Sequence, residues 1–127
     1  MIIATLVALL FFGGSGATLM TDNIERLHDS IKSELSKGST RDAAMDIADK
    51  MKDTNKDYGK ADGKAEKALI KLIEDYDTST ADVQNHLSQT NELRGEYQRK
   101  MLNLRFDLKR TLTSDEWHKL FSAKSVE

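Results

Sequence analysis

The chain has 127 residues, with 19 basic and 21 acidic side chains, a formal net charge of −2, and neither cysteine nor proline. This length suits one small domain. The absence of cysteine excludes disulfides, thiolate catalysis and thiolate metal sites. The slightly acidic balance, without a basic stripe, argues against nucleic-acid binding.

Residues 1–21 carry no charged side chain, whereas the charged residues all lie from Asp22 onwards. An apolar run followed by the small residues from Gly13 to Ala17 is typical of an export signal, with cleavage expected after Ala17. The stretch is also long enough to cross a bilayer as a retained anchor. A third alternative is a buried helix of the folded domain.

The first helical pattern is a narrow apolar stripe in steps of three and four residues, made of Ile24, Leu27, Ile31 and Leu35. Gly38 is expected to end this helix as its C′ residue. Ser39, with Asp42 three residues later, is expected to cap the next helix.

The second pattern runs from Ala44 to Tyr76 and predicts one helix of about 35 residues, roughly 50 Å long. Gly59 and Gly63 weaken its middle, where Tyr58 is the only large apolar side chain. We therefore expect a kink or local fraying near these glycines.

Ser79 and Asp82 predict the N-terminal cap of a third helix, whose apolar positions continue from Val83 to Leu112. Leu102 and Phe106 add a second apolar flank. The residues from Thr113 to Glu116 predict a capping box, and Leu112 with Trp117 predicts a hydrophobic staple. A last helix of about two turns is expected to follow, because a capping box begins a helix.

These elements predict an all-α fold: a long antiparallel helical hairpin with a shorter N-terminal helix and a short C-terminal helix, preceded by an apolar leader or anchor helix. The expected domains are a signal peptide or anchor at 1–21, a helical hairpin or bundle at 22–122, and a loose tail at 123–127. Tyr76 and Val83 are expected near the hairpin turn, with the first helix on the hairpin's open end.

No catalytic or ligand motif is present in the sequence, so no enzyme activity and no cofactor are predicted. The segment from Asp53 to Gly59 resembles the start of a calcium loop, but Tyr58 and Lys64 stand where that loop requires Gly and Glu. His28, His86 and His118 have no metal-ligating side chain three or four residues further along the chain. Only folding could bring them together on a metal.

The segment Leu112-Thr113-Ser114-Asp115-Glu116-Trp117 resembles the LTxxQ-type motif of small periplasmic helical proteins. These include Spy- and CpxP-like chaperones and periplasmic heavy-metal-resistance sensors. Glu116 replaces the Gln of the motif, Ser114 replaces the usual Pro, and an early second copy is missing. The resemblance implies dimers whose apolar concave face holds unfolded clients, or sensing through a membrane partner. It transfers no metal ligand to this chain.

The leading functional expectation is a non-enzymatic, extracytoplasmic helical protein that acts by binding a protein partner, an unfolded client or a second copy of itself. The expected binding residues form a strip only partly covered by the first helix: Leu93, Tyr97, Met101, Leu104 and Leu108, with Trp117 nearby. The alternatives are a structural subunit anchored in the inner membrane through residues 1–21, and a periplasmic metal sensor. Positively charged residues beside a membrane span favour its cytoplasmic side, so Arg26 and Lys32 would place the body of an anchored protein in the cytoplasm. The signal-like layout of residues 1–21 instead favours an extracytoplasmic position.

Overall fold

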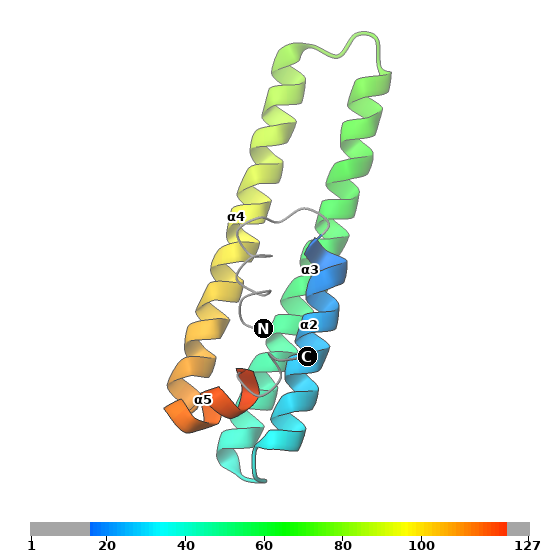
Figure 1. The fold of residues 1–127 in the computed structure, drawn as a ribbon. Helices are drawn as coiled ribbons and strands as arrows, with labels where there is room; N and C mark the ends of the chain where they lie inside the picture. The colour runs from blue at the N-terminus through cyan, green and yellow to red at the C-terminus, as the bar shows by residue number, and fades with distance from the viewer. Residues whose placement is uncertain (1–15, 122–127) are drawn as a thin grey trace.

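The computed structural model describes residues 16–121, and every regular element within them is a helix. The helices are α2 (Gly16–Glu34), α3 (Ser39–Glu74), α4 (Thr80–Thr111) and α5 (Ser114–Phe121). The predicted all-α class is therefore confirmed for this part of the chain. In Figure 1, α3 and α4 lie side by side and run in opposite directions, α2 packs on α3, and α5 packs on α2. No helix in this range combines the length and apolar character needed to cross a membrane.

The first helix is longer than its apolar stripe predicted. α2 begins at Gly16, two turns before Ile24, and crosses the expected boundary between the leader and the domain. It ends at Glu34, so Gly38 lies too far along the chain to be its C′ residue. Residues 1–15 and the predicted tail at 123–127 lie outside the described residues.

The predicted cap of the next helix at Ser39 is wrong. Ser39 is the first helical residue of α3, and Gly38 occupies the N-cap position with φ 158° and no side-chain hydrogen bond. The predicted pairing of Ser39 with Asp42 fails because the helix starts one residue early. The Asp42 N–H instead donates to the Gly38 carbonyl oxygen, 3.1 Å away.

α3 passes through Gly59 and Gly63 without interruption, so the weakening predicted there does not break the helix. The expected place of Tyr76 on its apolar stripe is wrong. The helix ends at Glu74, where the Asp77 N–H donates to the Asp75 carboxylate at 3.0 Å and forms a turn. Tyr76 lies in this turn and is 99% exposed.

The cap predicted at Ser79 and the capping box predicted at Thr113 are both confirmed, and the cap at Ser79 is itself a capping box. At the start of α4, the Asp82 N–H donates to Ser79 Oγ and the Ser79 N–H donates to the Asp82 carboxylate, both at 3.1 Å. At the start of α5, the Glu116 N–H donates to Thr113 Oγ1 at 3.2 Å, and the Thr113 N–H donates to Glu116 Oε1 at 2.9 Å. Each box satisfies two backbone donors that a helix start leaves without partners.

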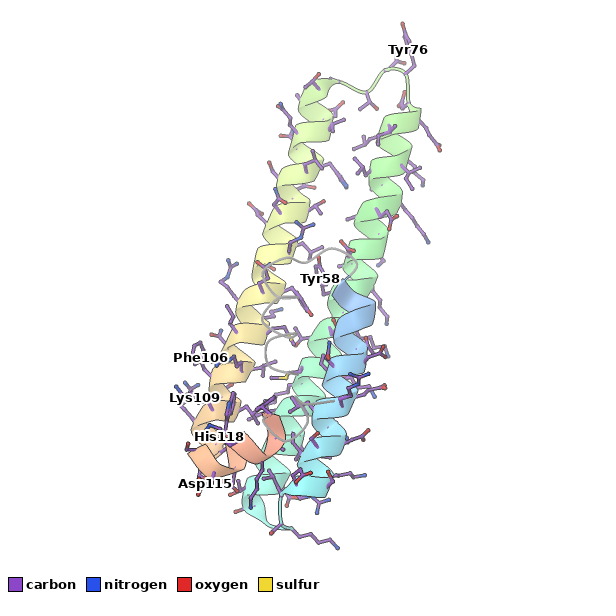
Figure 2. The ribbon with its side chains drawn as sticks, viewed as in Figure 1. Tyr58, Tyr76, Phe106, Lys109, Asp115 and His118 are labelled. Atoms are coloured by element: carbon purple, nitrogen blue, oxygen red, sulfur yellow. The ribbon has the colours of Figure 1, made fainter. Side chains whose placement is uncertain are left out.

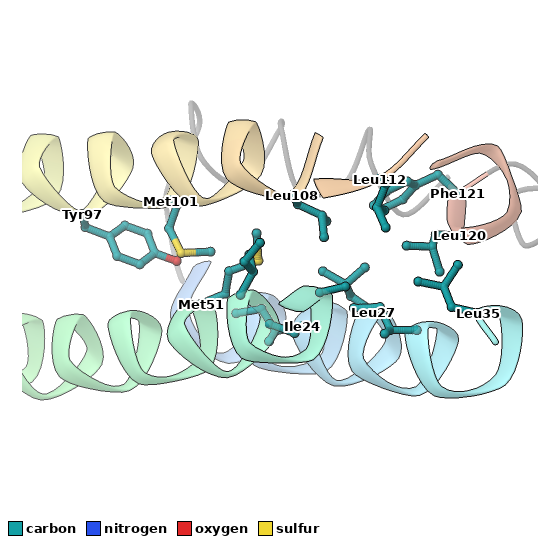
Figure 3. Close-up of a cluster of buried hydrophobic side chains, with 14 residues drawn as sticks. Ile24, Leu27, Leu35, Met51, Tyr97, Met101, Leu108, Leu112, Leu120 and Phe121 are labelled. Carbon is teal, nitrogen blue, oxygen red and sulfur yellow. The ribbon is translucent and has the colours of Figure 1, made fainter. Parts of the chain in front are cut away.

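All four helices contribute to one apolar core at the end of the molecule where α5 lies (Figure 3). α2 buries the stripe that the sequence predicted, and α5 closes the core with Leu120 and Phe121. The other buried side chains come from the first half of α3 and the second half of α4. They are Ala44, Ile47, Ala48 and Met51 on α3, and Tyr97, Met101 and Leu108 on α4.

The α3–α4 pair divides into two halves. We call residues 39–58 and 94–111 the covered half, because all of the buried α3 and α4 side chains lie there. We call residues 59–74 and 80–93 the bare half, because none of its side chains is fully buried. In Figure 1, α2 stops about midway along the pair. The core, and with it most of the apolar stabilisation, is therefore confined to one half of the length.

This division predicts unequal effects of two leucine truncations. Leu27→Ala removes a side chain with no exposed surface, and we expect it to lower the free energy of unfolding by about 2–5 kcal/mol because it leaves a cavity. Leu87→Ala, in the bare half, should change it by less than about 1 kcal/mol. Urea denaturation of both variants measures the difference. Equal losses would contradict a core confined to the covered half.

Candidate binding surfaces

The strip predicted to bind a partner is largely part of the core. Tyr97, Met101 and Leu108 are buried, and Leu104 packs against them half-buried. The expectation of a partly open strip is thus corrected for these residues, because α2 and α5 cover them. Leu93 stays half-buried beyond the end of α2, and Trp117 lies half-buried at the edge of the core.

A chain of two hydrogen bonds, centred on the buried Asn55, joins α2, α3 and α4. The Tyr97 hydroxyl donates to Asn55 Oδ1 at 2.9 Å, and Asn55 Nδ2 donates to Thr21 Oγ1 at 2.8 Å. Asn55 is buried, so each of its amide atoms needs a partner to offset the loss of water. Shifting any of the three helices along its axis would break this chain. It therefore fixes their register.

The Tyr97 ring is also held by an aromatic contact. Tyr58 stacks on it with ring centroids 4.2 Å apart and an interplanar angle of 18°. Burial, and to a smaller extent the neighbouring Tyr58, raises the pKa of the Tyr97 phenol well above its usual value. Tyr97 therefore stays protonated at neutral pH and acts as a hydrogen-bond donor, with no role as a base.

A shallow pocket of about 220 Å³ opens between α3 and α4 beside this tyrosine pair. Asp57, Glu96 and Lys100 contribute its charged groups. The remaining lining residues are Thr54, Tyr58, Ala61, Leu93 and Tyr97. The lining contains no histidine, cysteine or serine, so the pocket lacks the usual nucleophile–base pair.

An aromatic–cationic cluster lies where α4 meets α5. The Arg105 guanidinium carbon lies 5.2 Å from the Phe106 ring centroid and 5.4 Å from that of Trp117. Trp117 also contacts Phe121, with ring centroids 4.6 Å apart. Trp117 is therefore engaged within the chain, whereas Phe106 is 44% exposed on the outer side of α4 (Figure 2).

The three histidines do not meet. His28 Nε2 lies 3.5 Å from Asp49 Oδ1, and His86 Nε2 lies 2.8 Å from the carbonyl oxygen of Ala65. His118 Nδ1 lies 2.7 Å from the carbonyl oxygen of Ser114, within its own helix. Within residues 16–121, no group of three or more His, Asp or Glu side chains could hold a metal ion.

The exposed large apolar side chains of the bare half are the surface that the sequence analysis missed. Ile70 is 47% exposed, Ile73 is 68% exposed and Leu87 is 45% exposed, and Leu69 and Val83 beside them are half-buried. We call these five residues the apolar patch. The sequence did carry a signal, because Ile70 and Ile73 widen the predicted stripe beyond Leu69.

Helix geometry places the apolar patch on the side of the pair where α2 lies. Ile73 follows Asn55 by about five whole helical turns, so it shares the face of α3 that Asn55 turns toward α2. Leu87 precedes Met101 by about four whole turns and shares its buried face. The patch therefore continues the α2-covered face beyond the end of α2.

The buried hydroxyl of Tyr97 gives a testable contribution to stability. We expect Tyr97→Phe to lower the free energy of unfolding by about 1–3 kcal/mol, because a buried Asn55 oxygen loses a donor. Tyr76→Phe, which alters a fully exposed ring, should have no measurable effect. Urea denaturation at neutral pH distinguishes the two, and equal stabilities of Tyr97→Phe and the unmodified protein would contradict the structural role.

The raised pKa of Tyr97 adds a pH dependence. In the unfolded chain the phenol of Tyr97 loses its proton near pH 10. In the folded protein the same phenol is still protonated at that pH, because its pKa is raised. The stability that this phenol contributes is therefore complete below about pH 10 and decreases as the pH rises further. The unmodified protein should lose stability above that pH more steeply than Tyr97→Phe.

Comparison of the chain with models of protein families, with curated proteins and with solved structures finds no match. The functional inference is therefore made from the residues and surfaces of this chain.

Proposed function

We propose that this protein is a non-enzymatic, extracytoplasmic helical binding protein that holds apolar segments of other proteins, either as a chaperone or as a stress adaptor. Its architecture in this proposal is the long antiparallel hairpin of α3 and α4, with the shorter α2 and the short α5 at one end and a leader in front. Self-association into a homodimer through the same surface is part of the proposal. The one observation that carries it is the apolar patch.

The patch has properties that suit reversible binding. Ile70, Ile73 and Leu87 together expose apolar surface that water disfavours, and such patches mark interaction sites. Exposed charged residues of both signs lie beside it on α3, including Glu66, Lys67 and Glu74. A charged rim keeps an apolar surface soluble and makes contacts that are weak and exchangeable.

The covered half gives the patch a rigid base. The four-helix core and the Thr21–Asn55–Tyr97 chain hold α3 and α4 in fixed register at one end. The bare half extends from this base with less burial, and regions with few buried contacts open at lower free-energy cost. An adaptable surface on a fixed base suits clients of varied sequence.

The patch predicts a sharp difference between two charge substitutions. Leu87→Lys should reduce both the fluorescence of anilinonaphthalene sulfonate bound to the protein and the protein's ability to suppress aggregation of reductively unfolded lactalbumin, measured by light scattering. The physical reason is that a cation in the patch removes apolar contact area. We expect a loss of about tenfold in apparent affinity.

Phe106→Lys is the matched control, because Phe106 is 44% exposed and Leu87 is 45% exposed. Phe106 lies on the covered half, so this variant should bind both probes like the unmodified protein. The proposal fails if the two variants lose binding equally, or if the unmodified protein suppresses no aggregation.

The compartment is tested by the intact mass of the protein purified from native soluble and membrane fractions. A mass matching residues Thr18–Glu127 in the soluble fraction is expected, because the small residues before Thr18 suit signal cleavage. A full-length mass in the membrane fraction would instead support the structural subunit anchored through residues 1–21.

A further inference from the structure

We propose that the pocket between α3 and α4 binds a small organic ammonium ion, a free amine carried on a short apolar or aromatic stem. The pocket has a volume of about 220 Å³. Sites for drug-sized molecules measure roughly 300–1,000 Å³, so this one suits a smaller ligand. The inference goes beyond the proposed function and does not depend on it, because the pocket and the apolar patch are separate surfaces.

Two carboxylates line the pocket from opposite helices at the same height. Asp57 lies two residues after Asn55 on α3, and Glu96 lies one residue before Tyr97 on α4. Tyr97 bonds Asn55 and the two helices run antiparallel, so the two carboxylates are level to within about one residue, or roughly 1.5 Å along the axes. An ammonium group held between them can donate a hydrogen bond to each.

These carboxylates are available to a ligand. Both side chains are exposed, and neither Asp57 nor Glu96 forms an ion pair with another side chain of residues 16–121. Lys100 also lines the pocket, four residues after Glu96, at a spacing that often gives an ion pair on a helix. It forms none here. Two carboxylates against one ammonium leave the lining with a net negative charge that favours a cationic ligand.

The aromatic pair at the pocket favours an organic cation over an inorganic one. Tyr58 and Tyr97 both line the pocket, stacked with ring centroids 4.2 Å apart, and each directly follows one of the two carboxylates in the sequence. The face of a tyrosine ring attracts an ammonium ion held within about 6 Å. Carboxylates combined with aromatic rings recognise both the charge of an organic ammonium ion and its carbon atoms.

The two ends of the pocket differ, and this difference orients the ligand. Ala61 lies one turn after Asp57, and Leu93 lies about one turn before Glu96, so one end is apolar. Lys100 lies about one turn away in the other direction. The ammonium group therefore sits between the carboxylates with its stem toward the apolar end. The charge of Lys100 disfavours a second positive charge, so the pocket selects a monoamine over a diamine.

Helix geometry separates this pocket from the apolar patch. Asp57 follows Asn55 by two residues, or about 200° around α3, so it lies on nearly the opposite side of the helix from the bond that Asn55 makes to Thr21 of α2. Ile73 of the apolar patch shares the side of Asn55. Binding at the two surfaces can therefore be measured independently.

Titration of the full chain with phenethylammonium chloride, followed by NMR, tests the proposal. The ring signals of Tyr58 and Tyr97 should shift and reach saturation. Phenethyl alcohol has the same stem without the charge, and it should bind at least tenfold more weakly. The diamine putrescine should also bind more weakly, because Lys100 repels its second charge. Acetyl-lysine methylamide, which represents a lysine side chain of a partner protein, should bind more weakly than phenethylammonium because its stem has no aromatic ring.

Paired substitutions locate the site. Asp57→Asn combined with Glu96→Gln should weaken phenethylammonium binding at least tenfold, because both acceptors lose their charge. The matched control is Asp53→Asn with Glu92→Gln, one turn earlier on the same helices, where both side chains are exposed and lie outside the pocket lining. This control makes the same change in net charge and should leave binding unchanged. Lys100→Gln should tighten binding several-fold, since it removes a repelling charge.

Each outcome supports or overturns the proposal. It is overturned if the tyrosine signals show no saturable shift, if the two double variants lose binding equally, or if Lys100→Gln weakens binding. Tighter binding of acetyl-lysine methylamide than of phenethylammonium would overturn the assignment to a free amine. None of these results bears on the apolar patch, which Leu87→Lys tests separately.

Discussion

The hydrogen-bond chain from Thr21 through the buried Asn55 to Tyr97 is the constraint on which the rest of the structure depends. Apolar stripes of Leu, Ile and Ala tolerate sliding by one turn, because each turn presents a similar side chain. A buried amide does not, since a slip leaves its donor and acceptor without partners at a cost of about 1–3 kcal/mol each. Asn55 therefore fixes the axial register of α2 and α4 relative to α3.

This fixed axial register determines which apolar surfaces are buried and which are exposed. With Thr21 beside Asn55, the apolar stripe of α2 falls on the first half of α3 and the second half of α4. The residues expected to bind a partner, such as Met101 and Leu108, become core. The same placement leaves Ile70, Ile73 and Leu87 without cover from any described helix. Core and candidate binding surface are thus two consequences of one register.

The binding function proposed above is consistent with how the described polar groups are used. The polar groups that approach one another are committed to structure: Tyr97 donates to Asn55, and His118 lies against its own helix backbone. The pocket beside Tyr58 holds carboxylates and one lysine but no nucleophile–base pair. What remains available is apolar surface with a charged rim, which is the composition of a reversible interaction site.

The sequence by itself determined the helical class, the places where α4 and α5 begin and the inward stripe of α2. These depend on contacts within a few residues, as in the capping boxes at Ser79 and Thr113. Local patterns predicted the two ends of α3 less reliably. The helix begins at Ser39 with Gly38 as its N-cap, and it ends at Glu74, before a turn that contains Tyr76. Only the tertiary structure decided that Tyr97 and Met101 are core and that Ile73 is surface. All three have the apolar spacing of a buried stripe, and whether such a stripe is covered depends on how far a helix distant in sequence extends.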